Sequence, residues 1–151
     1  MTTLNVSTHV AAPIEQVFEV YTDLARVVER VPDITALEIL SEGPFGEGTR
    51  WRETRVIMKK QATEEMWVTD FAPPRSYNVQ AESHGMKYST HFSFTPDGDG
   101  TKVSWAFTGT AQTLGAKIMA PIFNLLMKGM MMKCMLRDLE ALRDVCQRGE
   151  G

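Results

Sequence analysis

The sequence predicts one α+β domain in which a seven-stranded antiparallel sheet packs against a long C-terminal helix. Six strand-like segments follow one another between Ile34 and Gly109 with no helical pattern among them, and a helical pattern then runs from about Leu114 to Val145. The 151 residues, 43% of them hydrophobic, are enough to bury a core without disulfides or a metal. We assign residues 1–147 to the domain and residues 148–151 to a flexible tail.

The elements are predicted from the N-terminus onward. Residues 1–10 alternate apolar and polar side chains, which is typical of a half-buried strand. Two short helices follow, the first opening at Pro13 and the second ending before Pro32. Turn residues then separate the six later strands, which should pair as an antiparallel meander because no crossover helix lies between them. These turns are Gly43–Gly48, Lys59-Lys60, Pro73-Pro74, His84-Gly85 and Asp97–Gly100.

The long helix carries an apolar stripe whose members recur every three or four residues. They are Ile118, Ile122, Leu125, Gly129, Met132, Leu136 and Leu139. We expect this stripe to face the sheet, which makes Ile122 and Leu125 candidate ligand contacts. Pro121 should separate a leading turn from the main helix or bend it.

The first half of this helix is also rich in methionine. Methionine most simply fills irregular gaps in the packing. The alternatives are a homodimer contact and, through Lys117, Lys128 and Lys133, contact with acidic lipid.

The composition argues against several classes of protein. A net charge of −3, from 16 basic and 19 acidic residues, is unlike that of a nucleic-acid-binding protein. Charged and polar residues interrupt the most apolar stretch, so we expect no transmembrane segment, and we expect a cytoplasmic protein because no secretory leader is visible. Cys134 and Cys146 lie about 18 Å apart along one helix and cannot form a disulfide with each other. The three histidines are scattered, so we predict no metal site and no cofactor.

Several short motifs carry a resemblance to a known family. They are Ala12-Pro13-Ile14-Glu15-Gln16-Val17-Phe18 with Tyr21-Thr22-Asp23, Gly46-Glu47-Gly48-Thr49-Arg50-Trp51, Phe71-Ala72-Pro73-Pro74-Arg75, and Gly98-Asp99-Gly100-Thr101-Lys102-Val103. In this order, over nearly the whole chain, they resemble the polyketide cyclase/dehydrase-like branch of the START (SRPBCC) superfamily. The resemblance implies a helix-grip fold, in which a curved antiparallel sheet wraps the C-terminal helix and leaves an elongated hydrophobic cavity. Superfamily members include lipid carriers, hormone receptors and aromatic cyclases, so the fold implies a pocket and leaves its use open.

Strand parity and turn length predict which side chains face the interior. A two-residue turn at His84-Gly85 pairs Ala81 with Tyr88, Val79 with Thr90, and Tyr77 with Phe92. A similar turn at Lys59-Lys60 pairs Ile57 with Ala62, Arg55 with Glu64, Glu53 with Met66, and Trp51 with Val68. The predicted ligand-binding residues on this face are Trp51, Glu53, Arg55, Glu64, Met66, Tyr77, Tyr88, Thr90, Phe92 and Trp105. His91 has the opposite parity and is expected on the solvent side.

Glu53, Arg55 and Glu64 are predicted to form a charged cluster on this otherwise apolar face. Burying one unpaired charge costs several kcal/mol, so the cluster must be internally paired, hydrated or completed by a ligand. An odd-length turn at Lys59-Lys60 would reverse the parity and send Glu53 and Arg55 to solvent. An inward Arg55–Glu64 contact can also be purely structural.

This pattern favours a protein that binds or carries a hydrophobic or aromatic small molecule, such as a lipid or polyketide. The alternative is a cofactor-free cyclase/dehydratase in which Glu53 or Glu64 is the base while Arg55 and Tyr88 hold a carbonyl. A second alternative is a regulatory protein-interaction module, which predicts little cavity and a large exposed apolar patch on the last helix.

Overall fold

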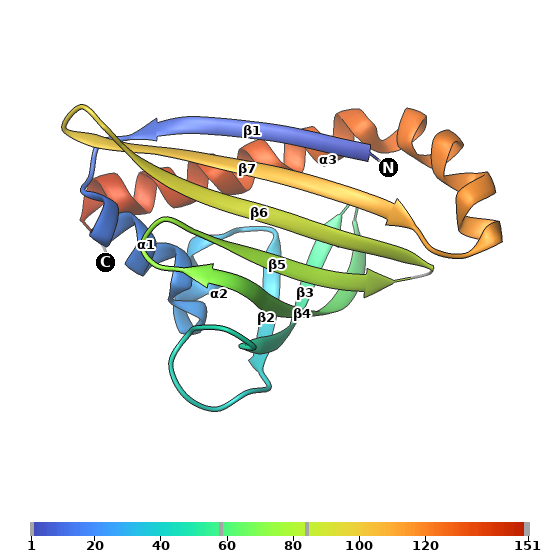
Figure 1. Ribbon diagram of the computed structural model, residues 1–151, viewed down its shortest axis with the longest axis horizontal. Coiled ribbons are helices and arrows are strands. Elements are labelled where there is room, and N and C mark those ends of the chain that lie inside the picture. The colour runs from blue at the N-terminus through green and yellow to red at the C-terminus, as the bar shows by residue number, and fades with distance from the viewer. Residues whose placement is uncertain (1, 58, 84, 150–151) are drawn as a thin grey trace.

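The computed structural model describes residues 2–57, 59–83 and 85–149 (Figure 1). The elements of these residues follow the order that the sequence predicts. They are β1 (Thr2–Val10), α1 (Ile14–Thr22), the 3₁₀ turn η1 (Leu24–Arg26), α2 (Val27–Arg30), β2 (Ile34–Ile39), β3 (Arg50–Ile57), β4 (Lys60–Ala72), β5 (Ser76–Ser83), β6 (Met86–Asp97), β7 (Gly100–Ala111) and α3 (Leu114–Arg148).

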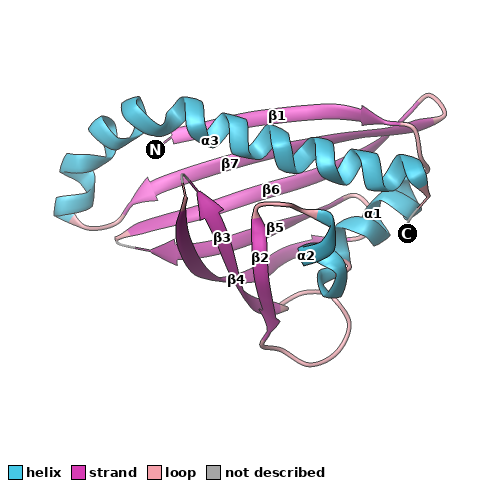
Figure 2. Ribbon diagram, turned by 180° about the vertical axis from the view of Figure 1, so that it is seen from behind, coloured by secondary structure: helices cyan, strands magenta, loops and turns pink. Residues whose placement is uncertain are grey.

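The strands form one antiparallel sheet in the order β1-β7-β6-β5-β4-β3-β2. Strands β2 to β7 are the predicted meander, and β1 joins it by pairing with β7, so that Val6 lies opposite Trp105. Figure 2 shows that β2, β3 and β4 run at a steep angle to β1 and β7, which gives a curved sheet, and that α3 lies across one side of it. This arrangement is the helix-grip fold, so the predicted fold class is confirmed.

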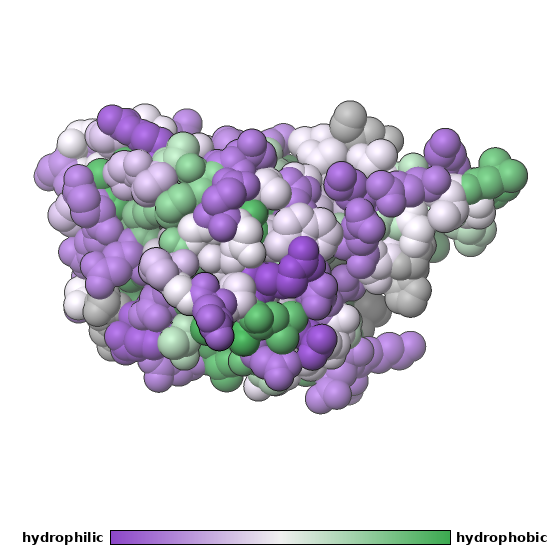
Figure 3. All heavy atoms as spheres, turned by 60° about the horizontal axis from the view of Figure 1, so that its bottom comes forward, coloured by the Kyte–Doolittle hydropathy of each residue, from purple (hydrophilic) through white to green (hydrophobic). Residues whose placement is uncertain are grey.

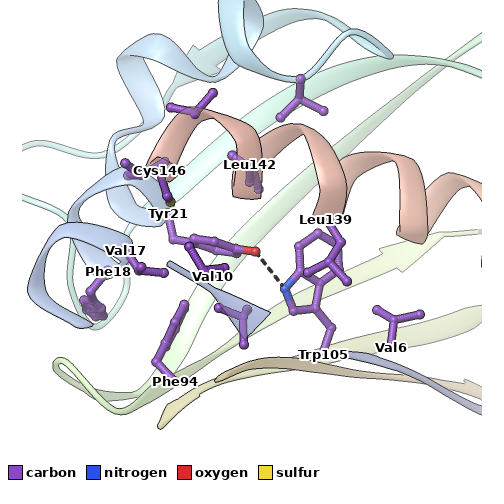
Figure 4. Packing of buried hydrophobic residues seen from close by; sticks show 14 of the residues in the cluster. Val6, Val10, Val17, Phe18, Tyr21, Phe94, Trp105, Leu139, Leu142 and Cys146 are labelled. Atoms are coloured by element: carbon purple, nitrogen blue, oxygen red, sulfur yellow. Dashed lines mark hydrogen bonds between the residues drawn. The ribbon is translucent and has the colours of Figure 1, made fainter. Parts of the chain in front are cut away.

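The core lies between the sheet, α1 and the C-terminal half of α3 (Figure 4). The hydroxyl of Tyr21 on α1 accepts a hydrogen bond of 3.2 Å from Nε1 of Trp105 on β7. The ring of Tyr21 also meets that of Phe94 edge-on, with their centroids 5.0 Å apart. Leu139 and Val145 of α3 are almost fully buried in the same cluster. Burying apolar side chains of this size contributes about 1.5–3 kcal/mol each, so this contact holds α3 onto the sheet.

The predicted pairing of β5 with β6 is confirmed. Val79 lies opposite Thr90 and Tyr77 lies opposite Phe92. Gly85 has a φ of 77°, which favours glycine at this turn. His84 itself lies outside the described residues.

The predicted register of β3 with β4 is wrong by two residues. Glu53, rather than Arg55, lies opposite Glu64, and Ile57 pairs with Lys60. The turn therefore falls one position earlier than predicted, with Lys59 in the left-handed region at a φ of 66°. No glycine or asparagine marks the position of this turn in the sequence. Because the shift is an even number of residues, the predicted interior face is unchanged.

Helix α3 consists of two arms, Leu114–Ile122 and Asn124–Arg148, which meet at a bend of 72°. Pro121 lies beside the bend and lacks the N–H that would continue the helical hydrogen bonding, in agreement with the prediction that it separates or bends the helix. Among the described residues, no single helix is long and apolar enough to cross a membrane, and the two arms meet that criterion only as a bent pair.

The predicted orientation of the apolar stripe on α3 is wrong for most of its length. Ile122 is 54% exposed and Leu125 is 84% exposed, so neither faces the sheet. The rotation of the second arm is set instead by Leu142 and Val145, whose side chains pack in the core. Counting back along the helix from these residues in steps of three or four leads to Met135, which lies on the same face. The same face continues toward the bend through Met131, Lys128, Met127 and Asn124. Of the predicted stripe, Leu139 is buried, whereas Ile118 and Leu136 are exposed like Ile122 and Leu125.

The end of α3 also differs from the prediction. The helix includes Arg148 and ends at Gly149, whose φ of 76° is left-handed and whose N–H donates to the carbonyl of Cys146. The helix therefore extends three residues beyond its predicted end at about Val145, and the flexible tail of residues 148–151 stays a prediction. Residues 150–151 lie outside the described residues.

Candidate ligand-binding cavity

A cavity of about 560 Å³ lies between the inner face of the sheet and α3. Its wall is mainly apolar, and it receives residues from every strand of the sheet, together with α1, α2 and the second arm of α3. The sequence-predicted residues that line it are Trp51, Glu53, Arg55, Glu64, Met66, Tyr77, Tyr88, Thr90, Phe92 and Trp105. Ile122 and Leu125 are the predicted residues that the structure leaves outside this lining.

Aromatic rings form one continuous part of the wall. Tyr77 of β5 stacks on Phe92 of β6 at a centroid distance of 5.0 Å, and Phe92 meets Trp105 edge-on at 5.3 Å. Phe45, from the segment between β2 and β3, lies edge-on to Tyr77 at 5.2 Å. The sequence does not predict Phe45 as a lining residue, because loop residues carry no parity signal. These packed rings offer a rigid apolar surface to an aromatic or aliphatic compound.

A charged cluster interrupts this apolar wall. Nη1 of Arg55 lies 2.8 Å from Oδ2 of Asp138, and Nη2 of Arg55 lies 3.6 Å from Oε2 of Glu53. The indole Nε1 of Trp51 donates a hydrogen bond of 3.1 Å to Oε1 of Glu53. Glu53 and Asp138 are each only 7% exposed. The cluster therefore joins β3 to α3 across the cavity.

The partner of Arg55 differs from the prediction. The expected contact was with Glu64, but the register shift places Ala62 opposite Arg55, and the guanidinium reaches Asp138 on the helix instead. Glu64 still lines the cavity, where its carboxylate lies close enough to Tyr88 to influence the hydroxyl. Asp138 was missed because it sits beside Arg137 and Glu140 in a stretch that has the composition of an exposed helix face.

Burial determines the protonation behaviour of this cluster. It raises the pKa of Asp138 to about 6, although the guanidinium of Arg55 pulls that value down. Burial would lower the pKa of Arg55, but the carboxylates of Asp138 and Glu53 outweigh it and raise the pKa above its usual value. Arg55 is therefore a permanent cation, and Asp138 can gain or lose a proton near neutral pH.

Two hydroxyls on the cavity wall are available to a ligand. Oδ1 of Asp138 also accepts no hydrogen bond from the described residues, but it is buried within the protein and is not accessible from the cavity. The hydroxyls of Tyr77 and Tyr88 likewise have no hydrogen-bond partner within the described part of the chain. Burial raises the pKa of both tyrosines, so both hydroxyls keep their protons and can donate. A molecule with an apolar body and a few oxygen atoms would satisfy these groups.

The second arm of α3 supplies further lining residues that the sequence pattern did not predict. Asn124, Met127, Lys128, Met131 and Met135 all contribute. They lie at helical spacing from the core residues near the end of α3, and following the helical period backward from that end would have found them.

Cys134 also lines the cavity, and burial raises the pKa of its thiol. Within the described residues, no three His, Cys, Asp or Glu side chains are placed to hold a metal ion. His91 is exposed beside Asn78, on the solvent side as predicted. Cys146 is buried, and burial raises the pKa of its thiol to about 11.

Comparison with known proteins identifies a family. A family model described as "Polyketide cyclase / dehydrase and lipid transport" matches residues 1–145. No sequence among the curated proteins matches the chain.

Several solved structures share the fold. The Zhui aromatase/cyclase from Streptomyces sp. R1128 superposes with a TM-score of 0.82 at 18% identity, over 97% of this chain and 94% of that one. A START superfamily protein from Mycobacterium smegmatis gives a TM-score of 0.75 at 17% identity, over 97% of each chain. The protein TTHA0849 from Thermus thermophilus gives 0.71 at 21% identity, over 97% of this chain and 95% of that one. At these identities the likeness concerns the fold alone.

Proposed function

The chain belongs to the polyketide cyclase / dehydrase and lipid transport family, and from that premise we propose that it binds a hydrophobic or aromatic small molecule between the sheet and α3. The observation that carries this proposal is an apolar cavity of about 560 Å³ whose wall contains one charged cluster. Pockets of roughly 300–1,000 Å³ with apolar walls and a few polar groups are typical of small-molecule sites. Carriage of a lipid- or polyketide-like compound fits this chemistry.

The charged cluster defines what the ligand should carry. Arg55 presents a permanent positive charge, while Tyr77 and Tyr88 present donor hydroxyls. A carbonyl, phenolate or carboxylate oxygen on an otherwise apolar molecule would pair with them. A wholly aliphatic compound would leave these groups without partners inside the cavity and should bind more weakly.

Native mass spectrometry of gently purified protein, followed by titration with 1-anilinonaphthalene-8-sulfonate, tests this proposal. That probe combines an aromatic body with an anionic oxygen group. We expect one bound molecule per chain and at least a tenfold loss of affinity in Arg55→Gln, since a charge-assisted hydrogen bond contributes about 1.5–3 kcal/mol. Arg52→Gln is the matched control, because Arg52 lies on the same strand with an exposed side chain. Equal affinity in both variants would remove Arg55 from the binding site.

Catalysis is the second candidate, and Asp138 is the observation that favours it. Its carboxylate lies against Arg55 and has a pKa of about 6, which suits a group that exchanges protons near neutral pH. In a cyclisation or dehydration of a poly-carbonyl compound, Asp138 or Glu53 would take a proton from the carbon beside a carbonyl. Arg55 would stabilise the enolate oxygen. In a cyclisation the enolate carbon would attack a second carbonyl carbon of the compound, and the protonated acid would give its proton to the alkoxide that forms. In a dehydration the acid would give its proton to a departing hydroxyl, releasing water.

Turnover of a poly-carbonyl compound separates the two candidates. If the protein is an enzyme of this kind, Asp138→Asn or Glu53→Gln should abolish product formation while leaving the affinity for the compound within about threefold. Wild-type protein that binds the compound and returns it unchanged would exclude the catalytic role.

Two further expectations from the sequence stay predictions. A homodimer through the methionine-rich part of α3 is tested by the mass of the protein in solution. The cytoplasmic location is tested by fractionation of cells. The regulatory protein-interaction module predicts little cavity and a large exposed apolar patch on the last helix. The cavity argues against it, whereas the exposed apolar residues of α3 agree with it, so it also stays a prediction.

A further inference from the structure

The first arm of α3 and the residues just after its bend present an uncovered apolar surface. Its members, here called the α3 apolar surface, are Leu114, Ile118, Met119, Ile122, Leu125 and Leu126, with exposures of 75%, 63%, 56%, 54%, 84% and 75%. At such exposures no other described element covers them. Figure 3 shows that the end of the molecule to which the first arm belongs projects beyond the rest of the surface, with hydrophobic atoms at its tip.

This projecting arm is attached to the sheet at its start. Thr113 precedes the helix, and its hydroxyl accepts a hydrogen bond of 3.1 Å from the N–H of Ala116. The N–H of Gln112 donates to the carbonyl of Gly85 at the β5–β6 turn, at 2.8 Å. The α3 apolar surface therefore belongs to an anchored, capped helix and is a defined face of the fold.

The charges on this part of α3 are all of one sign. Between Leu114 and Leu136 the sequence contains Lys117, Lys128 and Lys133 and no acidic residue. Within the described part of the chain, none of these lysines forms an ion pair. The whole chain has a net charge of −3, so this positive region is a local exception.

Lys128 lines the cavity together with Glu64, whereas Lys117 and Lys133 lie outside that lining. The next cation along the helix, Arg137, is paired with Asp33 at 2.9 Å. On the adjacent hairpin, Glu82 lies opposite Lys87, so that the hairpin adds no net charge. The exposed apolar side chains thus belong to a segment that also carries Lys117 and Lys133 and contains no acidic residue.

We propose that the α3 apolar surface docks onto the surface of an anionic lipid bilayer. The leucine, isoleucine and methionine side chains would enter the boundary between headgroups and acyl chains, and Lys117 and Lys133 would meet the lipid phosphates. A bilayer of this kind supplies both an apolar phase and negative charge. A symmetric contact between two copies would instead bring the same lysines together, with no acidic residue of the segment to offset them. This inference does not depend on the identity of the cavity ligand.

Vesicle flotation with the full chain tests the proposal. Vesicles of phosphatidylcholine alone are compared with vesicles that also contain phosphatidylserine, at low and at high salt. We expect binding only to the anionic vesicles, and weaker binding at high salt because salt screens the lysines. Replacing Lys117 or Lys133 by Glu should lower the affinity by about fivefold or more each. The double variant Ile118→Asp/Leu125→Asp should lose binding altogether.

Matched controls lie elsewhere on the surface. Ile39→Asp changes an apolar side chain on β2 that is 46% exposed, and Lys102→Glu reverses an exposed charge on β7. Both should bind anionic vesicles like the wild type, and circular dichroism should show that every variant is folded. Equal binding to both kinds of vesicle, or undiminished binding by Ile118→Asp/Leu125→Asp, overturns the proposal. A wild-type protein that does not bind anionic vesicles, and instead forms a dimer that is lost in Ile118→Asp/Leu125→Asp, would overturn the proposal in favour of self-association.

Discussion

The carboxylate of Asp138 lies 2.8 Å from the guanidinium of Arg55, which joins the second arm of α3 to β3 across the cavity. The two residues are far apart in the sequence, and each lies among apolar side chains. Breaking a buried pair by removing one member costs more than the pair contributes, because the other charge is left behind. The stability of the domain therefore depends on the same two side chains that give the cavity its charged cluster.

The stability of the protein should depend on the protonation of Asp138. Burial raises the pKa of this carboxyl to about 6 in the folded state, above its value of about 3.9 in an unfolded chain. The folded state holds the proton more tightly, so this contribution to stability is fully present below pH about 4 and is lost as the pH rises through 6. The asparagine in Asp138→Asn does not titrate. As the pH rises from 4 to 7, the difference in free energy of unfolding between this variant and the wild type should therefore change by about 1–3 kcal/mol in favour of the variant. Urea denaturation at several pH values measures this difference.

An exposed acid on the same helix is the control for this pH effect. The side chain of Asp144 is 53% exposed and lies 3.5 Å from Arg143. Asp144→Asn removes an exposed carboxylate from the same helix, and the change in unfolding free energy that it causes is the reference for the loss of a surface charge. A difference between Asp138→Asn and the wild type that does not change with pH would contradict the assignment of the titration to Asp138.

Tyr21 should contribute to stability through its hydroxyl as well as its ring. Tyr21→Phe leaves Nε1 of Trp105 buried without an acceptor, so we expect a loss of about 1–3 kcal/mol in the free energy of unfolding. Tyr88→Phe removes a hydroxyl that has no hydrogen-bond partner among the described residues, and it should cost less than about 0.5 kcal/mol. Denaturant titrations of the two variants decide the point, and equal losses would refute the role of the Tyr21–Trp105 bond.

Filling the cavity should block binding without unfolding the domain. Thr90 lines the cavity on β6, so Thr90→Trp should place an indole in the space that a ligand would occupy. We expect the affinity for 1-anilinonaphthalene-8-sulfonate to fall at least tenfold while the melting temperature changes little. Thr95→Trp, on the exposed face of the same strand, is the control and should bind the probe normally. Undiminished binding by Thr90→Trp would mean that the probe sits elsewhere.

Replacing each of two glycines by alanine should change the stability of the protein in opposite directions. A Cβ at Gly100 would overlap the backbone oxygen of Val10, so Gly100→Ala should destabilise the protein by about 2–4 kcal/mol. Gly129 lies inside α3 with nothing near its Cβ position, and Gly129→Ala should stabilise the protein by about 0.5–1 kcal/mol. Thermal unfolding of both variants measures the effect, and destabilisation by Gly129→Ala would contradict the placement of this residue on an open helix face.

The sequence predicts the meander of β2 to β7 because no crossover helix separates these segments, and it predicts the interior face because period-2 alternation is unchanged by a register error of two residues. The place of β1 beside β7 was not predicted. The β5–β6 register could be predicted because its turn contains a glycine. The β3–β4 turn instead places Lys59 at a positive φ, and a lysine in a sequence does not indicate a turn with that conformation. The predicted β3–β4 register was therefore wrong by two residues. Glu53 and Arg55 were still predicted on the correct face, but Arg55 was assigned the wrong partner.

The orientation of α3 could not be predicted, because a helical stripe defines a direction only while the helix is straight. The bend beside Pro121 separates the two arms, and tertiary packing of Leu142 and Val145 then sets the rotation of the second one. Leu125 consequently points away from the sheet. Asp138 gave no local sign of burial either, since only the fold brings Arg55 to it.

The pairing of β1 with β7 imposes an order on folding. Thr3 pairs with Thr108, so β1 cannot take its place in the sheet until β7 is available, about a hundred residues further along the chain. Contacts between such distant positions slow folding and leave the nascent chain open to aggregation.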